Sequence, residues 1–93
     1  MKKLLFLSSF ERSVKSLTAH DKELLAKSLE TLNTFLITGS APFGFRLKKL
    51  DHDKFEFRID IRLRVVAKIE KDCLFLVLAG NHEDVRRYLR NIR

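Results

Sequence analysis

The clearest pattern in this chain is the alternation of apolar and polar residues between positions 55 and 69. Apolar side chains occupy every second position, and charged side chains occupy all but one of the positions between them. Successive side chains of a β-strand point to opposite faces, so this period of two predicts strands with one apolar and one charged face. The segment is too long for one typical strand. We therefore expect a bend or tight turn near Asp60 to Arg62 that divides it into two strands.

Shorter apolar segments extend this predicted sheet in both directions along the chain. We expect a first strand at residues 4–7 and another at residues 45–50, with a turn at residues 51–54 before the alternating segment. A turn at residues 70–72 precedes the apolar segment from Cys73 to Ala79. Because this last segment is apolar on both faces, we place it in the interior of the sheet.

Apolar residues recur at helical spacing in three other places. Ser8 and Glu11 have the spacing of a capping box, in which a hydroxyl and a carboxylate satisfy free amides at a helix start. Thr18 and Asp21 repeat the signal before a longer helix that Gly39 should end. The apolar stripe of that helix comprises Leu24, Leu25, Leu29, Leu32 and Leu36. Asn81 is expected to cap a short last helix with the stripe Val85, Leu89 and Ile92.

The predicted order is therefore β-α-α-β-β-β-α. This order indicates an α+β fold: a four-stranded antiparallel sheet, with a short N-terminal or edge strand in addition, packed on one face by an α-helical hairpin. A chain of 93 residues is typical of one domain, and the pattern shows no repeat or linker, so we expect a single domain over residues 1–93.

The charge and cysteine content of the chain indicate which kinds of partner and which cellular compartment to expect. The chain has 19 Lys and Arg against 12 Asp and Glu, a net charge of +7. This balance favours nucleic acid or an acidic protein segment as partner, although solubility alone would also explain it. The single cysteine, Cys73, excludes an intrachain disulfide and is typical of a reducing cytoplasm. The apolar segment near the N-terminus is too short for a signal peptide or a membrane span, so we expect a cytoplasmic protein without membrane contact.

Several features of the chain together resemble the RelE/ParE toxin superfamily of bacterial toxin–antitoxin modules. These features are the element order, the segment Arg-Leu-Lys-Lys-Leu at residues 46–50, the arginines at positions 58, 62 and 64, and an apolar strand ending in Gly-Asn-His at residues 80–82. The closer similarity is to the RelE-like branch of mRNA interferases. It implies the toxin of a type II module: a ribosome-dependent endonuclease that cleaves mRNA in the A site by attack of the ribose 2′-OH on the adjacent phosphate. It also implies a cognate antitoxin, mRNA on the ribosome and ribosomal RNA as partners.

The resemblance also assigns catalytic roles. His82 lies where relatives have a catalytic histidine or arginine, Arg64 where they have an arginine opening a long strand, and Tyr88 matches a tyrosine six residues further on. The alternatives are that His82 only occupies a helix entrance and that Tyr88 fills the core. The histidines share no metal-ligand spacing and one cysteine cannot complete a zinc site, so we expect a metal-independent reaction without a cofactor.

The same resemblance suggests RNA-binding residues. Lys48 and Lys49 fall where relatives have lysines that face the mRNA, and because they point to opposite faces of one strand, Lys48, on the face of Arg46, is favoured. Arg58 lies on the charged face with Arg64 and is suited to bidentate phosphate contacts, or to pairing with Glu56 and Asp60. Two alternatives to the nuclease remain: a ParE-like inhibitor of DNA gyrase, and a catalytically degenerate relative that only binds its antitoxin.

Overall fold

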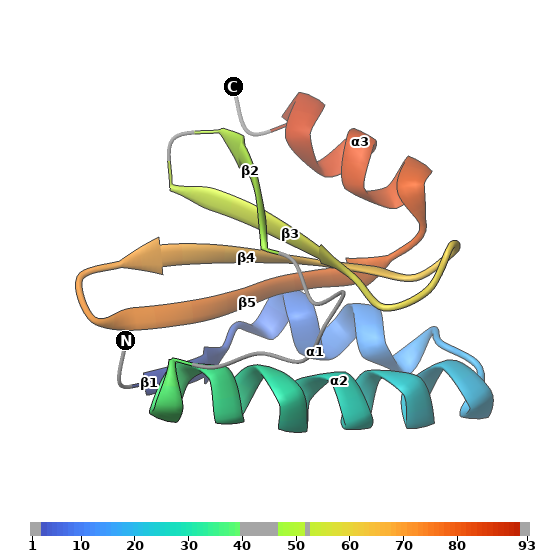
Figure 1. Cartoon of the computed structure of the whole chain (residues 1–93). Coiled ribbons are helices and arrows are strands. Elements are labelled where there is room, and N and C mark those ends of the chain that lie inside the picture. Colours follow the sequence, from blue (N-terminus) through green and yellow to red (C-terminus); the bar gives the residue numbers. More distant parts are fainter. Residues whose placement is uncertain (1–2, 40–46, 52, 92–93) are drawn as a thin grey trace.

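The structure is a computed structural model that describes residues 3–39, 47–51 and 53–91 (Figure 1). Within these ranges lie five strands, β1 to β5, and three helices, α1 to α3. Their bounds are β1 Lys3–Phe6, α1 Ser8–Lys15, α2 Ala19–Thr38, β2 Lys48–Asp51, β3 Lys54–Arg58, β4 Arg64–Glu70, β5 Cys73–Gly80 and α3 His82–Asn91. The order along the chain is β-α-α-β-β-β-β-α, with one strand more after the two helices than in the predicted order, and the α+β fold class is confirmed.

The strands form one mixed sheet in the order β1-β5-β4-β3-β2. Strands β2 to β5 pair antiparallel, and the short β1 adds to β5 in parallel as an edge strand. This arrangement confirms the four-stranded antiparallel sheet with a short edge strand. Strand β5 lies in the interior, between β1 and β4, as its apolar sequence predicted.

Helices cover both faces of the sheet. Helices α1 and α2 lie on one face, and α3 lies on the other (Figure 1). The larger core lies beneath α1 and α2, and its buried residues are Phe10, Leu25, Leu32, Phe57, Val65, Ala67, Leu74, Leu76 and Ala79. A smaller core lies beneath α3, where Val85 packs on Val66 and Val77. The charged face that the alternation left open to solvent is thus partly covered by the last helix.

The bend expected near Asp60 to Arg62 is confirmed. The Asp60 carboxylate accepts hydrogen bonds from the backbone N–H groups of Arg62 at 2.8 Å and Leu63 at 2.7 Å. The chain leaves the sheet after Arg58, so alternation no longer determines which side chains are buried. Ile61, which the alternation placed in the apolar row, is consequently 82% exposed.

Two of the predicted ends of the first two helices are confirmed, and one predicted cap is wrong. Thr18 Oγ1 accepts from Asp21 N at 3.1 Å, and Gly39 has the left-handed φ of 77° at the end of α2. The capping box predicted for the first helix is wrong. The N-cap is Leu7, whose side chain has no hydrogen-bonding group, and Ser8 is already the first residue of the helix. The backbone N–H of Leu7 donates to Leu76 O of β5 at 3.0 Å.

Strand β5 extends beyond the end of β1, and serines of α1 satisfy its unpaired edge. Ser9 Oγ donates to Val77 O at 2.7 Å, and Ser13 Oγ accepts from Ala79 N at 3.0 Å. These contacts fix α1 along the outer side of β5. Among the described residues, no helix is long and apolar enough to cross a membrane.

Candidate functional site

The strand registers place several charged residues, Lys54 and Lys68 among them, on the sheet face that α3 partly covers. Arg58 lies opposite Arg64, and Lys48 lies opposite Glu56. Residues directly opposite in a β-ladder share a face, as do residues two apart in a strand. Lys48, Glu56, Arg58 and Arg64 therefore form one cluster, which we call the basic face. The prediction that Arg58 and Arg64 share a face is confirmed.

Glu56 and Arg64 form an ion pair within the basic face. Arg64 Nη1 lies 3.3 Å from Glu56 Oε2, and the two side chains are 13% and 7% exposed. The pair offsets the repulsion between Arg58 and Arg64, which directly opposite like charges would otherwise feel. Arg64 Nε is buried and has no hydrogen-bond partner among the described residues. A buried donor without a partner is uncommon in folded proteins.

Glu56 is the residue at this site that the sequence interpretation did not single out. The alternation placed it on the charged face, where it was considered only as a pairing partner for Arg58. It is buried and pairs with Arg64 of the neighbouring strand, eight positions later in the chain. The only sequence signal was a carboxylate within a row of arginines, and that signal alone does not predict burial.

The predicted RNA-binding residues divide between two faces. Lys48 is exposed on the basic face, whereas Lys49 lies opposite Phe55 and points to the other face, as its strand position implied. Arg58 is exposed. Arg46 lies outside the described residues. The structure thus brings Lys48, Arg58 and Arg64 together and separates Lys49 from them.

His82 and Tyr88 lie on different sides of α3. His82 is the exposed first residue of the helix, two positions after Gly80, which lies opposite Arg64 in the sheet. An α-helix turns 360° in 3.6 residues, so side chains six residues apart differ in direction by about 120°. Tyr88 is half-buried and packs against the smaller core. Of the three predicted catalytic residues, only Tyr88 lines the groove described next.

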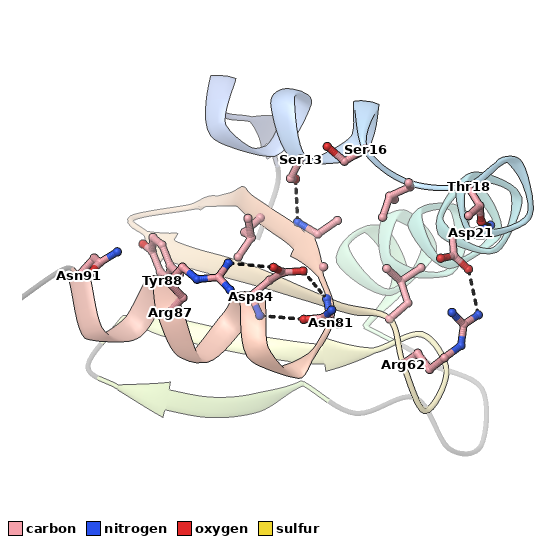
Figure 2. Close-up of a pocket in the computed structure, with 15 residues that line it drawn as sticks. Ser13, Ser16, Thr18, Asp21, Arg62, Asn81, Asp84, Arg87, Tyr88 and Asn91 are labelled. Atoms are coloured by element: carbon pink, nitrogen blue, oxygen red, sulfur yellow. Dashed lines mark hydrogen bonds and ion pairs between the residues drawn. The ribbon is translucent and has the colours of Figure 1, made fainter.

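Tyr88 instead borders a groove between α1 and α3, which we call the α1–α3 groove (Figure 2). Its volume is about 520 Å³. Its lining residues are Ser13, Ser16, Leu17, Thr18, Asp21, Arg62, Leu63, Leu78, Ala79, Gly80, Asn81, Asp84, Arg87, Tyr88 and Asn91. The groove follows the edge of β5 that β1 leaves unpaired.

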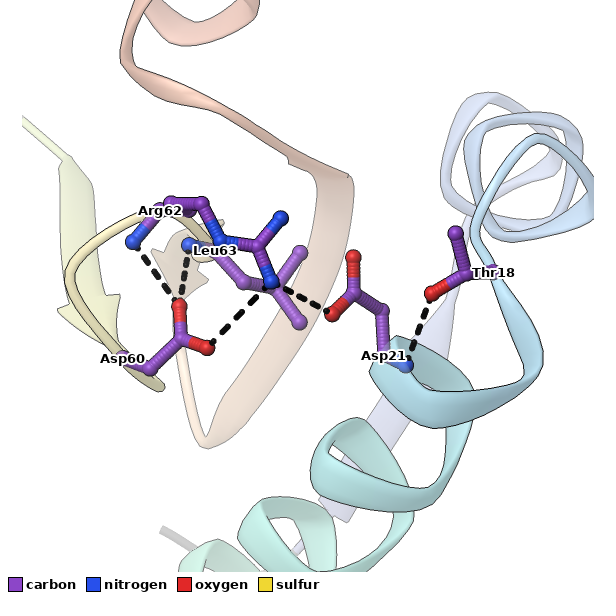
Figure 3. Close-up of polar contacts among 5 residues, drawn as sticks. All are labelled: Thr18, Asp21, Asp60, Arg62 and Leu63. Carbon is purple, nitrogen blue, oxygen red and sulfur yellow. Dashed lines mark hydrogen bonds and ion pairs between the residues drawn. The ribbon is translucent and has the colours of Figure 1, made fainter.

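One end of the groove is held by an ion pair between α2 and the β3–β4 loop (Figure 3). Arg62 Nη2 lies 3.4 Å from Asp21 Oδ1 and 4.0 Å from Asp60 Oδ2. Arg62 is 65% exposed but has these two partners. Hydrogen bonds from the backbone N–H groups of Leu63 and Arg62 hold the pKa of Asp60 below its ordinary value.

The start of α3 forms another part of the groove wall (Figure 2). Asn81 Oδ1 accepts from Asp84 N at 2.8 Å, and Asp84 Oδ2 accepts from Asn81 N at 2.9 Å, so the predicted cap at Asn81 is confirmed. Asp84 Oδ1 also lies 3.2 Å from Arg87 Nη1. A Cβ atom on Gly80 would lie 2.6 Å from Asp84 Oδ2, so only glycine leaves room for this reciprocal cap.

The basic face has the chemistry of an anion-binding site with a proton-transfer group beside it. Arginine guanidinium groups bind phosphate through directed N–H bonds, and histidine is the side chain best suited to proton transfer near neutral pH. Across the described part of the chain, no three His, Cys, Asp or Glu residues gather in a group that could hold a metal ion.

Comparisons with known proteins identify the fold. No family model and no curated protein matches the chain by sequence. The RelE toxin in the RelB–RelE antitoxin–toxin complex from Methanococcus jannaschii matches with a TM-score of 0.68 at 14% identity, over 90% of this chain and 96% of that one. The Escherichia coli DinJ–YafQ complex matches with a TM-score of 0.67 at 17% identity, over 91% and 98%. A copper-bound mutant toxin from Helicobacter pylori matches with a TM-score of 0.63 at 22% identity, over 91% and 99%.

These similarities extend over nearly the whole of both chains in each pair. At such low identities they establish the architecture and not the activity. The chain therefore has the fold of the RelE and YafQ toxins of toxin–antitoxin modules.

Proposed function

We propose that this protein is the toxin of a type II toxin–antitoxin module and that it cleaves mRNA on the ribosome. The fold that it shares with RelE and YafQ supports the toxin role. The observation that carries the nuclease proposal is the position of Arg64, which lies beside Arg58 on the basic face and opposite Gly80, two residues before His82. A phosphate oxygen is the acceptor that such a guanidinium group would bind.

The proposed reaction is attack of a ribose 2′-OH on the adjacent phosphorus. The 2′-oxygen loses its proton and forms a bond to phosphorus, while the bond from phosphorus to the 5′-oxygen breaks and that oxygen gains a proton. The products are a 2′,3′-cyclic phosphate and a 5′-hydroxyl end. Such a reaction requires a proton acceptor, a proton donor and cations for the charge that grows on the phosphate oxygens.

The residues of the basic face fit these requirements in different ways. Arg64 would contact the phosphate oxygens, and Glu56 would hold its guanidinium group in a fixed direction. His82, exposed at the start of α3, would transfer a proton. Lys48 and Arg58 are exposed on the same face and would bind neighbouring phosphates by charge.

Ribosome dependence and the partners belong to the same proposal. One histidine and one largely buried arginine cannot position the substrate fully by themselves, so the ribosome would hold the mRNA in place. The M. jannaschii and E. coli structures are antitoxin–toxin complexes. We therefore propose a cognate antitoxin whose acidic side chains cover the basic face of this chain, and a site of action in the cytoplasm, where translating ribosomes are found.

The test is induction of the chain alone, followed by primer extension on cellular mRNA. Cuts within codons, a halt in translation and poor cleavage of purified RNA without ribosomes are expected. His82→Ala should remove the cuts, and Lys27→Ala, which removes an exposed cation of α2 far from the basic face, should retain them. Intact mRNA together with DNA breaks linked to gyrase would refute the nuclease and favour the ParE-like activity instead.

A further inference from the structure

The α1–α3 groove has the size and shape of a small-molecule site. Its volume of about 520 Å³ lies within the range of about 300–1,000 Å³ that is common for ligand pockets. Leu17 and Leu78 provide apolar surface, and polar side chains of α1 and α3 face each other across it (Figure 2). Apolar surface with a few convergent polar groups is typical of sites for small organic ligands.

The charges of the groove are compensated within its own walls. Asp21 pairs with Arg62 at one end, and Asp84 pairs with Arg87 along α3. With two acidic and two basic side chains, the described lining has no net charge. The groove therefore does not select a phosphate group, in contrast to the basic face. It favours a ligand portion that is itself neutral.

Three side chains leave hydrogen-bonding groups available to such a ligand. The hydroxyl of Ser16, the phenol of Tyr88 and the amide of Asn91 line the groove, and they have no hydrogen-bond partner among the described residues. Amide and hydroxyl groups recognise the edges of nucleobases, and an aromatic side chain can stack on a base. A neutral, planar heterocycle with donors and acceptors at its edge matches these groups.

The position of the groove connects it to the basic face. Gly80 and Asn81 line one end of it, and His82 is the next residue in the chain. Gly80 also lies opposite Arg64 across the sheet. An RNA strand with one phosphate at Arg64 would therefore pass the start of α3, where an adjoining base could turn into the groove.

We propose that the α1–α3 groove binds the base of a nucleotide that flanks the cleaved phosphate and so contributes to sequence preference. This inference rests on the proposed function and deepens it. A polypeptide strand added along β5 is the competing occupant, but Ser9 and Ser13 of α1 already occupy Val77 O and Ala79 N, the groups that such a strand would need.

The test separates binding from cleavage. Short RNAs carrying 2′-O-methyl groups lack the attacking hydroxyl and cannot be cleaved, so they are titrated into the ¹⁵N-labelled protein. We expect shifts at the amides of Leu78 and Asn81 and on α3, and base-dependent affinity. Asn91→Ala should weaken binding by about three- to tenfold, the range for one lost hydrogen bond. Asn33→Ala, an exposed asparagine of α2 outside the groove, is the matched control and should bind normally.

A second measurement uses cleavage on the ribosome. Asn91→Ala should flatten the base preference at one position beside the cut while the rate at other sites changes little. Unchanged RNA binding and unchanged base preference in Asn91→Ala would overturn the inference. Normal RNA binding and cleavage together with a weakened antitoxin complex would also overturn it, because the groove would then be a protein-docking surface. Methylated RNA that binds in the groove, together with no cleavage on ribosomes, would refute the proposed function and support the subsite.

Discussion

Removal of the Arg64 side chain is expected to destabilise the fold in addition to any effect on activity. In Arg64→Ala, the carboxylate of Glu56 stays only 7% exposed but loses the cation 3.3 Å away. Breaking a fully buried ion pair on one side costs about 3–5 kcal/mol because a buried charge is left without a partner. Arg64 is itself 13% exposed, and water can enter the space of its guanidinium group, so we expect a smaller loss of about 2–3 kcal/mol. For a domain of this length that loss lowers Tm by roughly 10–20 °C.

The assay is a double-mutant cycle in denaturant with the variants Arg64→Ala, Glu56→Leu and the two combined. The double variant should be close to the wild type in its free energy of unfolding, because replacing both partners by apolar groups leaves no uncompensated charge. Cleavage on ribosomes is then compared between the wild type and the double variant. A double variant that folds normally and does not cleave assigns the Glu56–Arg64 pair to the reaction independently of stability.

An Arg64→Ala protein with the melting transition of the wild type would refute this reasoning. Such a result would place the Glu56–Arg64 pair among surface ion pairs, which contribute about 0–1 kcal/mol. It would also mean that Glu56 reaches solvent in solution and that α3 does not cover the basic face as firmly as the packing of Val85 indicates.

Three further outcomes follow from single contacts. His82→Ala should lower cleavage by about a hundred- to ten-thousand-fold, the usual contribution of a positioned acid–base group, and should leave Tm unchanged because the side chain is exposed. A primer-extension assay and a thermal melt test these two expectations, and cleavage at the wild-type rate would exclude His82 from proton transfer. Gly80→Ala should lower the free energy of unfolding by about 1 kcal/mol, because its Cβ would lie 2.6 Å from Asp84 Oδ2 and displace the cap of α3; a denaturant melt equal to the wild type would contradict the cap. The lowered pKa of Asp60 means that its carboxylate stabilises the fold above its unfolded pKa and that this contribution is lost as pH falls through the folded pKa. The stability advantage of the wild type over Asp60→Asn should therefore shrink below about pH 4, and an advantage that does not change between pH 7 and 2 would show that the loop hydrogen bonds do not depend on the charge.

Local patterns in the sequence were sufficient to predict the elements and most of their ends. The period of two between residues 55 and 69 gave β3 and β4, and the acceptor side chain of Asp60 closes the predicted bend. Thr18, Gly39 and Asn81 mark helix ends because each acts on backbone groups within four residues. Strand pairing also followed from alternation to the extent that Arg58 and Arg64 share a face. These features could be predicted because their causes lie within one turn or one hairpin.

Contacts between distant segments could not be predicted in this way. The amphipathic stripe of α3 showed that the helix must pack, but it did not show that it packs on the charged face of the sheet. That choice turns Tyr88 toward the α1–α3 groove, away from the side of the helix on which His82 lies. The ion pair of Asp21 with Arg62 likewise joins residues 41 positions apart. The sequence determined which faces are apolar, because periodicity is a property of each segment alone. Only the tertiary structure decided which faces meet, because that depends on burying apolar surface from all segments at once.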